Sequence, residues 1–395
     1  MAAVSAPAVP RWDLSALFGG MDDPRIEETW VRCMEKAAAF AERYRGKINS
    51  PDLSAETLAS AIAELESLIQ ESAKPGNYGQ LLFAGDSSDA KIGAFMQKQM
   101  EKSSALSVQV MFFELELQDV PEETMSRIID DPKLAQYKHY ISVARKLSPH
   151  KLTEAEEIIL EETANTGSRA WVRLFEEVTS NYAFKLRRPG SEGVEEVSQE
   201  EVLNLLRESD RDLRQAAADA MSEGLLDMQR VLVFIYNNLL QDKNVEDRLR
   251  KHSFPEESRH LRNELDPETV DMVMRLCREH YGLVERFYRV KREILGLPEL
   301  THIDRYAPLF DTEEQIAWDE ARRIVVEAFG SFSGEMASRA DEFFEKSWID
   351  AEIRKGKQGG AFCAYITPDT HPVVMMTYLN KLDNVMTLAH ELGHG

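Results

Sequence analysis

The residues of this chain best suited to chemistry are two histidines one helical turn apart, with a glutamate directly after the first. They occur in the sequence HELGHG, which occupies residues 390–395. Side chains four residues apart lie on one face of an α-helix, so His390 and His394 can reach the same tetrahedral zinc ion at roughly 2.0–2.1 Å. Glu391 is then rotated away from the metal and can act on a water molecule. The motif therefore predicts a hydrolytic zinc site.

The alternative is a pair of surface histidines that solvent satisfies. A chain with 9 His and 69 acidic residues contains at most about 0.04 such motifs by chance. Asp383 is a natural N-cap, so we expect a helix from Asn384 onward. This helix should have two faces, an apolar one and a polar one: Val385, Leu388, Ala389 and Leu392 on the first, and Thr387, His390, Glu391 and His394 on the second.

A small β-sheet is expected directly before this helix. Residues 361–366 and 373–378 are two β-prone runs, and residues 367–370 between them have the composition of a turn. We predict that the two strands are antiparallel neighbours and lie beside the helix. His371 falls at the turn, where it is either a structural residue or a contact for substrate.

A catalytic zinc needs one protein ligand more than the two histidines supply, because such sites have three protein ligands and one open position. No other histidine has the spacing of a metal ligand, and we interpret the remaining ones as surface or structural residues: His139, His150, His252, His260, His280 and His302. No third ligand is evident before Gly395, so we expect this chain alone to bind zinc weakly and to have negligible peptidase activity.

Helical periodicity dominates the chain before residue 355. Pro75 and Gly76 are expected to end a helix that begins near Glu56, and residues 267–295 and 312–329 are expected to form single helices. Residues 182–186 and 194–197 read as a hairpin. The hairpin suggests a boundary between an N-terminal helical lobe, residues 1–190, and a second part, residues 191–395.

Composition narrows the classes of partner. The chain has 395 residues and a net charge of -22, which argues against binding to nucleic acid or to an anionic membrane surface. Its three cysteines form no CxxC pair, and its N-terminus lacks the pattern of a signal peptide. No run of about 18 apolar residues occurs. We therefore expect a cytoplasmic protein.

Short stretches within residues 348–395 carry a family resemblance. They are Trp348-Ile349-Asp350, Arg354-Lys355-Gly356-Lys357, Gly360-Ala361-Phe362, His371-Pro372 and Thr387-Leu388-Ala389 followed by HELGHG, with looser matches at residues 12–14, 165–175 and 304–308. Together they resemble the oligoendopeptidase F group of the thimet-oligopeptidase-like zinc metallopeptidases.

The resemblance implies a mainly α, zincin-like oligopeptidase fold and one Zn²⁺ per chain. It implies that His390 and His394 bind zinc, that Glu391 is the general base, and that a later glutamate completes the metal shell. We therefore expect the chain to be the N-terminal portion of the family fold, with its third ligand downstream of residue 395. The preceding helices would form a channel that admits short peptides.

By the same resemblance, the Gly360-Ala361-Phe362 strand would offer its backbone to an extended peptide, whereas its residues alone allow a simple tight turn. The sequence thus predicts a zinc metalloendopeptidase of oligopeptides. The alternative is a helical peptide-binding or scaffolding protein without turnover.

Overall fold

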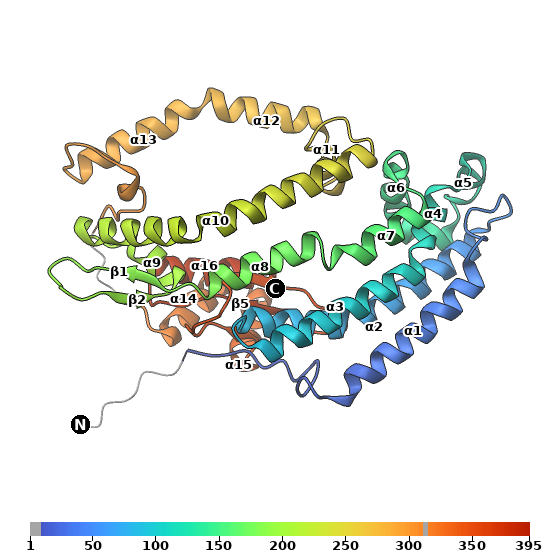
Figure 1. Ribbon diagram of the computed structural model, residues 1–395, viewed down its shortest axis with the longest axis horizontal. Coiled ribbons are helices and arrows are strands. Elements are labelled where there is room, and N and C mark those ends of the chain that lie inside the picture. Colours follow the sequence, from blue (N-terminus) through green and yellow to red (C-terminus); the bar gives the residue numbers. More distant parts are fainter. Residues whose placement is uncertain (1–8, 311–314) are drawn as a thin grey trace.

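The computed structural model describes residues 9–310 and 315–395, and these are mostly helical (Figure 1). The elements of the first half are α1 (Pro24–Tyr44), α2 (Ala55–Gly85), α3 (Ala90–Val110), α4 (Phe112–Gln118), α5 (Glu122–Ile128), η1 (Pro132–Tyr137), α6 (Lys138–Lys146), η2 (Ser148–His150), α7 (Glu154–Ala164), α8 (Ser168–Ser180), β1 (Phe184–Leu186) and β2 (Glu195–Val197).

The second half contains α9 (Gln199–Leu205), α10 (Arg211–Leu249), α11 (Glu257–Arg262), α12 (Pro267–Glu279), α13 (Tyr281–Ile294), η3 (His302–Asp304), α14 (Trp318–Phe332), α15 (Gly334–Glu345), β3 (Ile349–Asp350), β4 (Phe362–Ala364), β5 (Val373–Met375) and α16 (Leu382–His394). The mainly α fold class is confirmed. None of the described helices combines the length and apolar character needed to cross a membrane.

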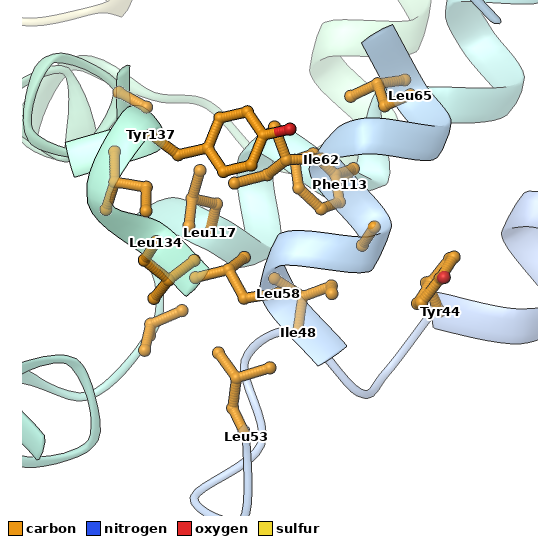
Figure 2. Close-up of a cluster of buried hydrophobic side chains, with 14 of the residues drawn as sticks. Tyr44, Ile48, Leu53, Leu58, Ile62, Leu65, Phe113, Leu117, Leu134 and Tyr137 are labelled. Carbon is orange, nitrogen blue, oxygen red and sulfur yellow. The ribbon is translucent and has the colours of Figure 1, made fainter. Parts of the chain in front are cut away.

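The N-terminal helices pack through apolar stripes that their sequences repeat every three or four residues. Ser54 and Asp89 cap α2 and α3 by accepting hydrogen bonds from backbone N–H groups of the first turn. At one end of the lobe, side chains from α1, α2, α4, η1 and α6 form a core around Phe113 and Leu134, both fully buried. Figure 2 shows how the α2 residues Leu58 and Ile62 face Leu117 and Leu134 in this cluster.

Three helix boundaries differ from expectation. Pro75 lies inside α2 rather than at its end. Proline removes one helical hydrogen bond, and the burial of this residue within a helix of 31 residues offsets that loss. The expected helix at 267–295 is two helices that meet at His280. The helix expected at 312–329 begins at Trp318, and residues 312–314 lie outside the described residues.

The predicted hairpin is confirmed, since β1 and β2 are antiparallel with Phe184 opposite Val197. It packs on α10 at Gly224, where a Cβ atom would lie 2.5 Å from the Phe184 ring. Only glycine permits this approach of helix and strand. Ser198 and Glu201 form the capping box expected at the start of α9, and Thr153 and Glu156 form the one at α7.

Helices α12 and α13 form an arch that stands off α10 (Figure 1). Among the described residues of α12 none is buried, and in α13 Lys291 is the one that is. The Lys291 ammonium donates to the carbonyl of Arg305 at 2.8 Å, which ties the end of the arch to the loop after η3.

A buried ion cluster holds η3 against the start of α10. Asp304 is fully buried and accepts hydrogen bonds from Arg211 at 3.0 Å and from Arg214 at 2.9 Å. The hydrogen bond from Arg211, helped by one from the Thr301 N–H, holds the pKa of Asp304 well below its usual range. The cluster therefore stabilises the fold when the carboxylate is ionised.

Replacing Asp304 by Asn should lower the free energy of unfolding by about 3 kcal/mol at neutral pH, because both guanidinium groups lose their counter-charge. The folded-state pKa of Asp304 lies below its unfolded value of about 4, so its contribution is full above about pH 5 and decreases as the pH falls below 4. Urea unfolding at neutral and acidic pH measures the loss of unfolding free energy in the Asp304→Asn protein at each pH. Asp242→Asn, at an exposed position of α10, is the control, and an equal effect of Asp304→Asn at both pH values would contradict the account.

The second sheet is central to the candidate site and has the strand order β3-β5-β4. Strand β5 pairs antiparallel with β4, Phe362 opposite Met375, which confirms the prediction, although both strands are shorter than expected. Strand β3 pairs with β5 in parallel and was not predicted. Val373 packs toward α1 and α2, whereas Val374 packs toward α14 and α16, so the sheet separates two apolar cores.

Candidate active site

The HELGHG sequence lies on α16, which starts earlier than expected. The cap is Lys381, not Asp383. The side-chain oxygen of Asn384 accepts hydrogen bonds from the backbone N–H groups of Leu379 and Lys381, at 2.9 and 3.3 Å, and so fixes the first turn. The Asp383 carboxylate instead forms an ion pair with Arg207. The amide thus replaces the carboxylate as the group that organises this helix start.

The two histidines converge as the sequence predicts. The Nε2 atoms of His390 and His394 are 3.2 Å apart, and the ring planes are perpendicular. Two ligands of a tetrahedral zinc ion at 2.0–2.1 Å are about 3.3 Å apart, so the donor pair fits this metal. Both histidines are exposed, which leaves them accessible to an ion and to a substrate. No further His, Cys, Asp or Glu of the described residues joins this pair in a three-ligand group.

Glu391 does not share the exposure of the histidines. It is 7% exposed and lies with Leu388 and Leu392 on the buried side of α16, not on the polar face where it was expected. Its carboxylate lies near Cys363 of β4, which packs against α16. Burial, with a smaller effect of the Glu391 carboxylate, raises the pKa of the Cys363 thiol to about 11, so this thiol is not a nucleophile at neutral pH.

Tyr365 fastens the end of α16 to the strand region. Its hydroxyl donates a hydrogen bond to the backbone carbonyl of His394 at 2.7 Å. The contact orients the second histidine through its backbone. This contact was not predicted, since no spacing pattern in the sequence links Tyr365 to the helix.

The tentative substrate residues are divided between two places. Gly360 has φ +85° and its N–H donates to Glu200 at 3.0 Å, so it makes the tight turn into β4. Ala361 and Phe362 are half-buried, and β4 is an edge strand whose outer side pairs with no other strand among the described residues. His371 stacks on Trp348 with ring centroids 3.9 Å apart. A contact between His371 and substrate stays a prediction.

A buried charged cluster fixes the loop between β3 and β4. Arg354 donates to both carboxylate oxygens of Asp350, at 2.7 and 2.8 Å, and the Lys357 ammonium donates to the same carboxylate at 2.6 Å. Lys357 also donates to the carbonyl of Met376 at 2.6 Å, and burial lowers its pKa. The spacing of these residues, with charges four and seven positions after Asp350 in a glycine-rich stretch, is the signal that could have predicted the cluster.

Lys357→Met should lower the free energy of unfolding by about 3 kcal/mol, because it removes one partner of a buried ion pair and the hydrogen bonds that Lys357 donates to three backbone carbonyls. Urea unfolding measures the change. Lys355→Met, an exposed lysine in the same loop, should have little effect. Equal stability of the two variants would show that the cluster does not support the sheet.

The family of this chain follows from its similarity to known proteins. Residues 116–184 match the family model described as oligopeptidase F, and residues 204–395 match that of peptidase family M3. This chain belongs to peptidase family M3. Among M3 relatives, it is 24% identical to the group B oligopeptidase PepB of Streptococcus agalactiae over 97% of its own length, and 23% identical to the oligopeptidase PepF of Bacillus subtilis over 97%. The resemblance to the oligoendopeptidase F group is confirmed.

Solved structures of other peptidases have the same fold. The crystal structure of oligoendopeptidase-F from Enterococcus faecium matches with a TM-score of 0.65 and 20% identity, covering 81% of this chain and 66% of that one. PZ peptidase A matches with a TM-score of 0.69 and 16% identity, covering 94% and 62%. The chain spans 63% of the length of PepB and 56% of that of PepF.

Proposed function

We propose that the protein is a zinc-dependent endopeptidase that hydrolyses internal bonds of short oligopeptides. The observation that carries this proposal is the pair of imidazole nitrogens of His390 and His394 on α16, which are 3.2 Å apart. The carboxylate of Glu391 belongs to the residue directly after His390. Membership of family M3 supports the same reaction class. Three free cysteines, Cys33, Cys277 and Cys363, support a reducing and therefore cytoplasmic location.

Each residue of the motif has a separate task. His390 and His394 hold the zinc ion, which when bound polarises the scissile carbonyl and lowers the pKa of water. Glu391 accepts the proton of the attacking water and later delivers it to the departing amine. The carboxylate is buried near Cys363, which restricts its contact with bulk solvent.

The substrate is proposed to bind along β4. This strand is at the edge of the sheet and contacts α16, so a peptide paired with its outer side would lie next to the histidines. The N–H of Gly360 is already bonded to Glu200, so the pairing would use Phe362–Ala364 and not the glycine turn before it. An extended chain is needed for such pairing, which favours short, unfolded peptides.

Hydrolysis of an internally quenched peptide tests the proposal. The assay uses the full-length protein, meaning a version as long as the relatives of which this chain spans 63% and 56%. Cleavage should disappear after treatment with a chelator and return when zinc is added, because the reaction requires the metal at His390 and His394. Binding of the peptide without cleavage, in the presence of zinc, would instead identify a peptide-binding or scaffolding protein. Cleavage that the chelator does not affect would exclude a metallopeptidase.

A further inference from the structure

Three potential metal ligands lie together away from α16. One ring nitrogen of His150, one of His252 and a carboxylate oxygen of Glu257 are all within 4.8 Å of one another. His150 ends η2, His252 follows the C-terminal end of α10, and Glu257 begins α11. Both histidines were expected to be surface or structural residues, because ligands so far apart in the chain leave no spacing signal.

A backbone carbonyl fixes the protonation of His150. Its Nδ1 lies 3.0 Å from the carbonyl oxygen of Arg250. A carbonyl only accepts hydrogen bonds, so Nδ1 carries the proton and the lone pair of the neutral ring is on Nε2. Metal-binding histidines commonly have this second bond, which sets the tautomer and orients the ring.

His252 provides the second, independent indication of a ligand. Its side chain is 5% exposed, and its Nδ1 has no hydrogen-bond partner in the described part of the chain. This nitrogen is 3.4 Å from Oε2 of Glu257, which itself accepts a hydrogen bond from the Ser253 N–H at 2.5 Å. A buried polar atom without a partner is unusual in folded proteins, and an ion between the two groups would satisfy it.

The local charge favours a divalent cation. The Arg250 guanidinium reaches the His150 carbonyl at 3.4 Å, and it is paired with Glu157 through two hydrogen bonds of 2.6 and 2.8 Å and with Glu246 through one of 2.8 Å. Two carboxylates therefore surround one guanidinium, and the Glu257 carboxylate adds a further negative charge. The three carboxylates of Glu157, Glu246 and Glu257 outnumber the one guanidinium that pairs with two of them.

The free cluster is more open than a bound site. The rings of His150 and His252 are stacked, with centroids 4.2 Å apart and an angle of 18° between planes. Ligands of a tetrahedral zinc ion are about 3.3 Å apart and their lone pairs converge. Binding must therefore rotate the His252 ring out of the stack, a change that its unbonded Nδ1 does not oppose.

We propose that His150, His252 and Glu257 form a second metal site that takes zinc or a similar divalent transition metal. Two imidazoles and one carboxylate are a donor set that suits zinc. The bound ion would connect the turn between α6 and α7 to the turn between α10 and α11, which now meet through Arg250 and its bonds to His150 and Glu157. Its role would be structural, since it would fasten the base of the arch to the N-terminal lobe.

Zinc titration of the 395-residue chain carrying His390→Ala and His394→Ala tests the proposal without interference from α16. Calorimetry should detect one zinc ion per chain, and zinc should raise the Tm of this protein. Adding Glu257→Gln should weaken zinc binding about tenfold or more and remove the rise in Tm, because the amide is a poorer ligand than the carboxylate. His139→Ala, which removes an exposed histidine that also contacts a glutamate, is the matched control and should change neither.

His252→Ala should abolish the binding, and circular dichroism shows whether that variant folds. If it does not, Glu257→Gln and His150→Ala decide the question, since both residues are half-buried and their replacement leaves no large cavity. Equal zinc affinity with and without Glu257→Gln, or no zinc binding by the His390→Ala, His394→Ala protein, would overturn the proposal and leave an ion pair between His252 and Glu257.

Discussion

Replacing Glu391 by Gln in the full-length protein is expected to lower kcat for peptide hydrolysis by about three orders of magnitude while zinc remains bound. The amide has nearly the same volume as the carboxylate, so it fits the buried position beside Cys363. It cannot accept the proton of the attacking water. Both histidines are unchanged, so metal content should stay at the wild-type value. Stopped assays with a quenched peptide, with zinc measured on the same sample, separate the two effects.

Glu335→Gln is the matched control for that experiment. Glu335 is a carboxylate that lines a hollow next to Gly393, but it is on α15 and not on the zinc-binding helix. The control should retain wild-type turnover. Near-normal kcat in the Glu391→Gln protein would reject the role of Glu391 as general base, and loss of zinc from that variant would assign the residue to the metal site instead.

In the full-length protein, replacing His394 by Ala should remove stoichiometric zinc and, with it, hydrolysis. A ligand lost from the metal should weaken binding by more than about a hundredfold, the upper end of the effect of losing an outer-shell partner. The fold of α16 should survive, because Tyr365 bonds the backbone carbonyl of residue 394 and not its side chain. Equilibrium dialysis with zinc measures the affinity, and circular dichroism checks the helix.

His139→Ala serves as the control for this second variant, since His139 is exposed and paired with Glu264. Its zinc affinity and turnover should equal those of the wild type. Full activity of the His394→Ala protein would show that the imidazole pair on α16 is not the metal centre.

Local sequence patterns predicted the parts of this fold that local physics decides. The capping boxes at Thr153 and Ser198 satisfy backbone N–H groups within four residues, so their signal is complete in the sequence. The same holds for the convergence of His390 and His394, since one helical turn fixes their separation.

Features set by distant residues were not predictable from the sequence. Pro75 remains inside α2, where it is buried, and the Asp383 carboxylate pairs with Arg207 instead of capping α16. Strand β3 has only two residues, too few to show an alternating pattern. Glu391 lies at the border between two helix faces, and its burial depends on the elements that pack on α16, among them α14 and β4.

The most direct test of the central claim is the anomalous scattering of crystals of the full-length protein grown with zinc, measured at the zinc absorption edge. The account predicts a strong peak at 2.0–2.1 Å from the Nε2 atoms of both His390 and His394. A second peak at His150 and His252 would belong to the additional site and would not bear on this claim. A zinc-loaded, peptide-cleaving protein with no peak between His390 and His394 would contradict it.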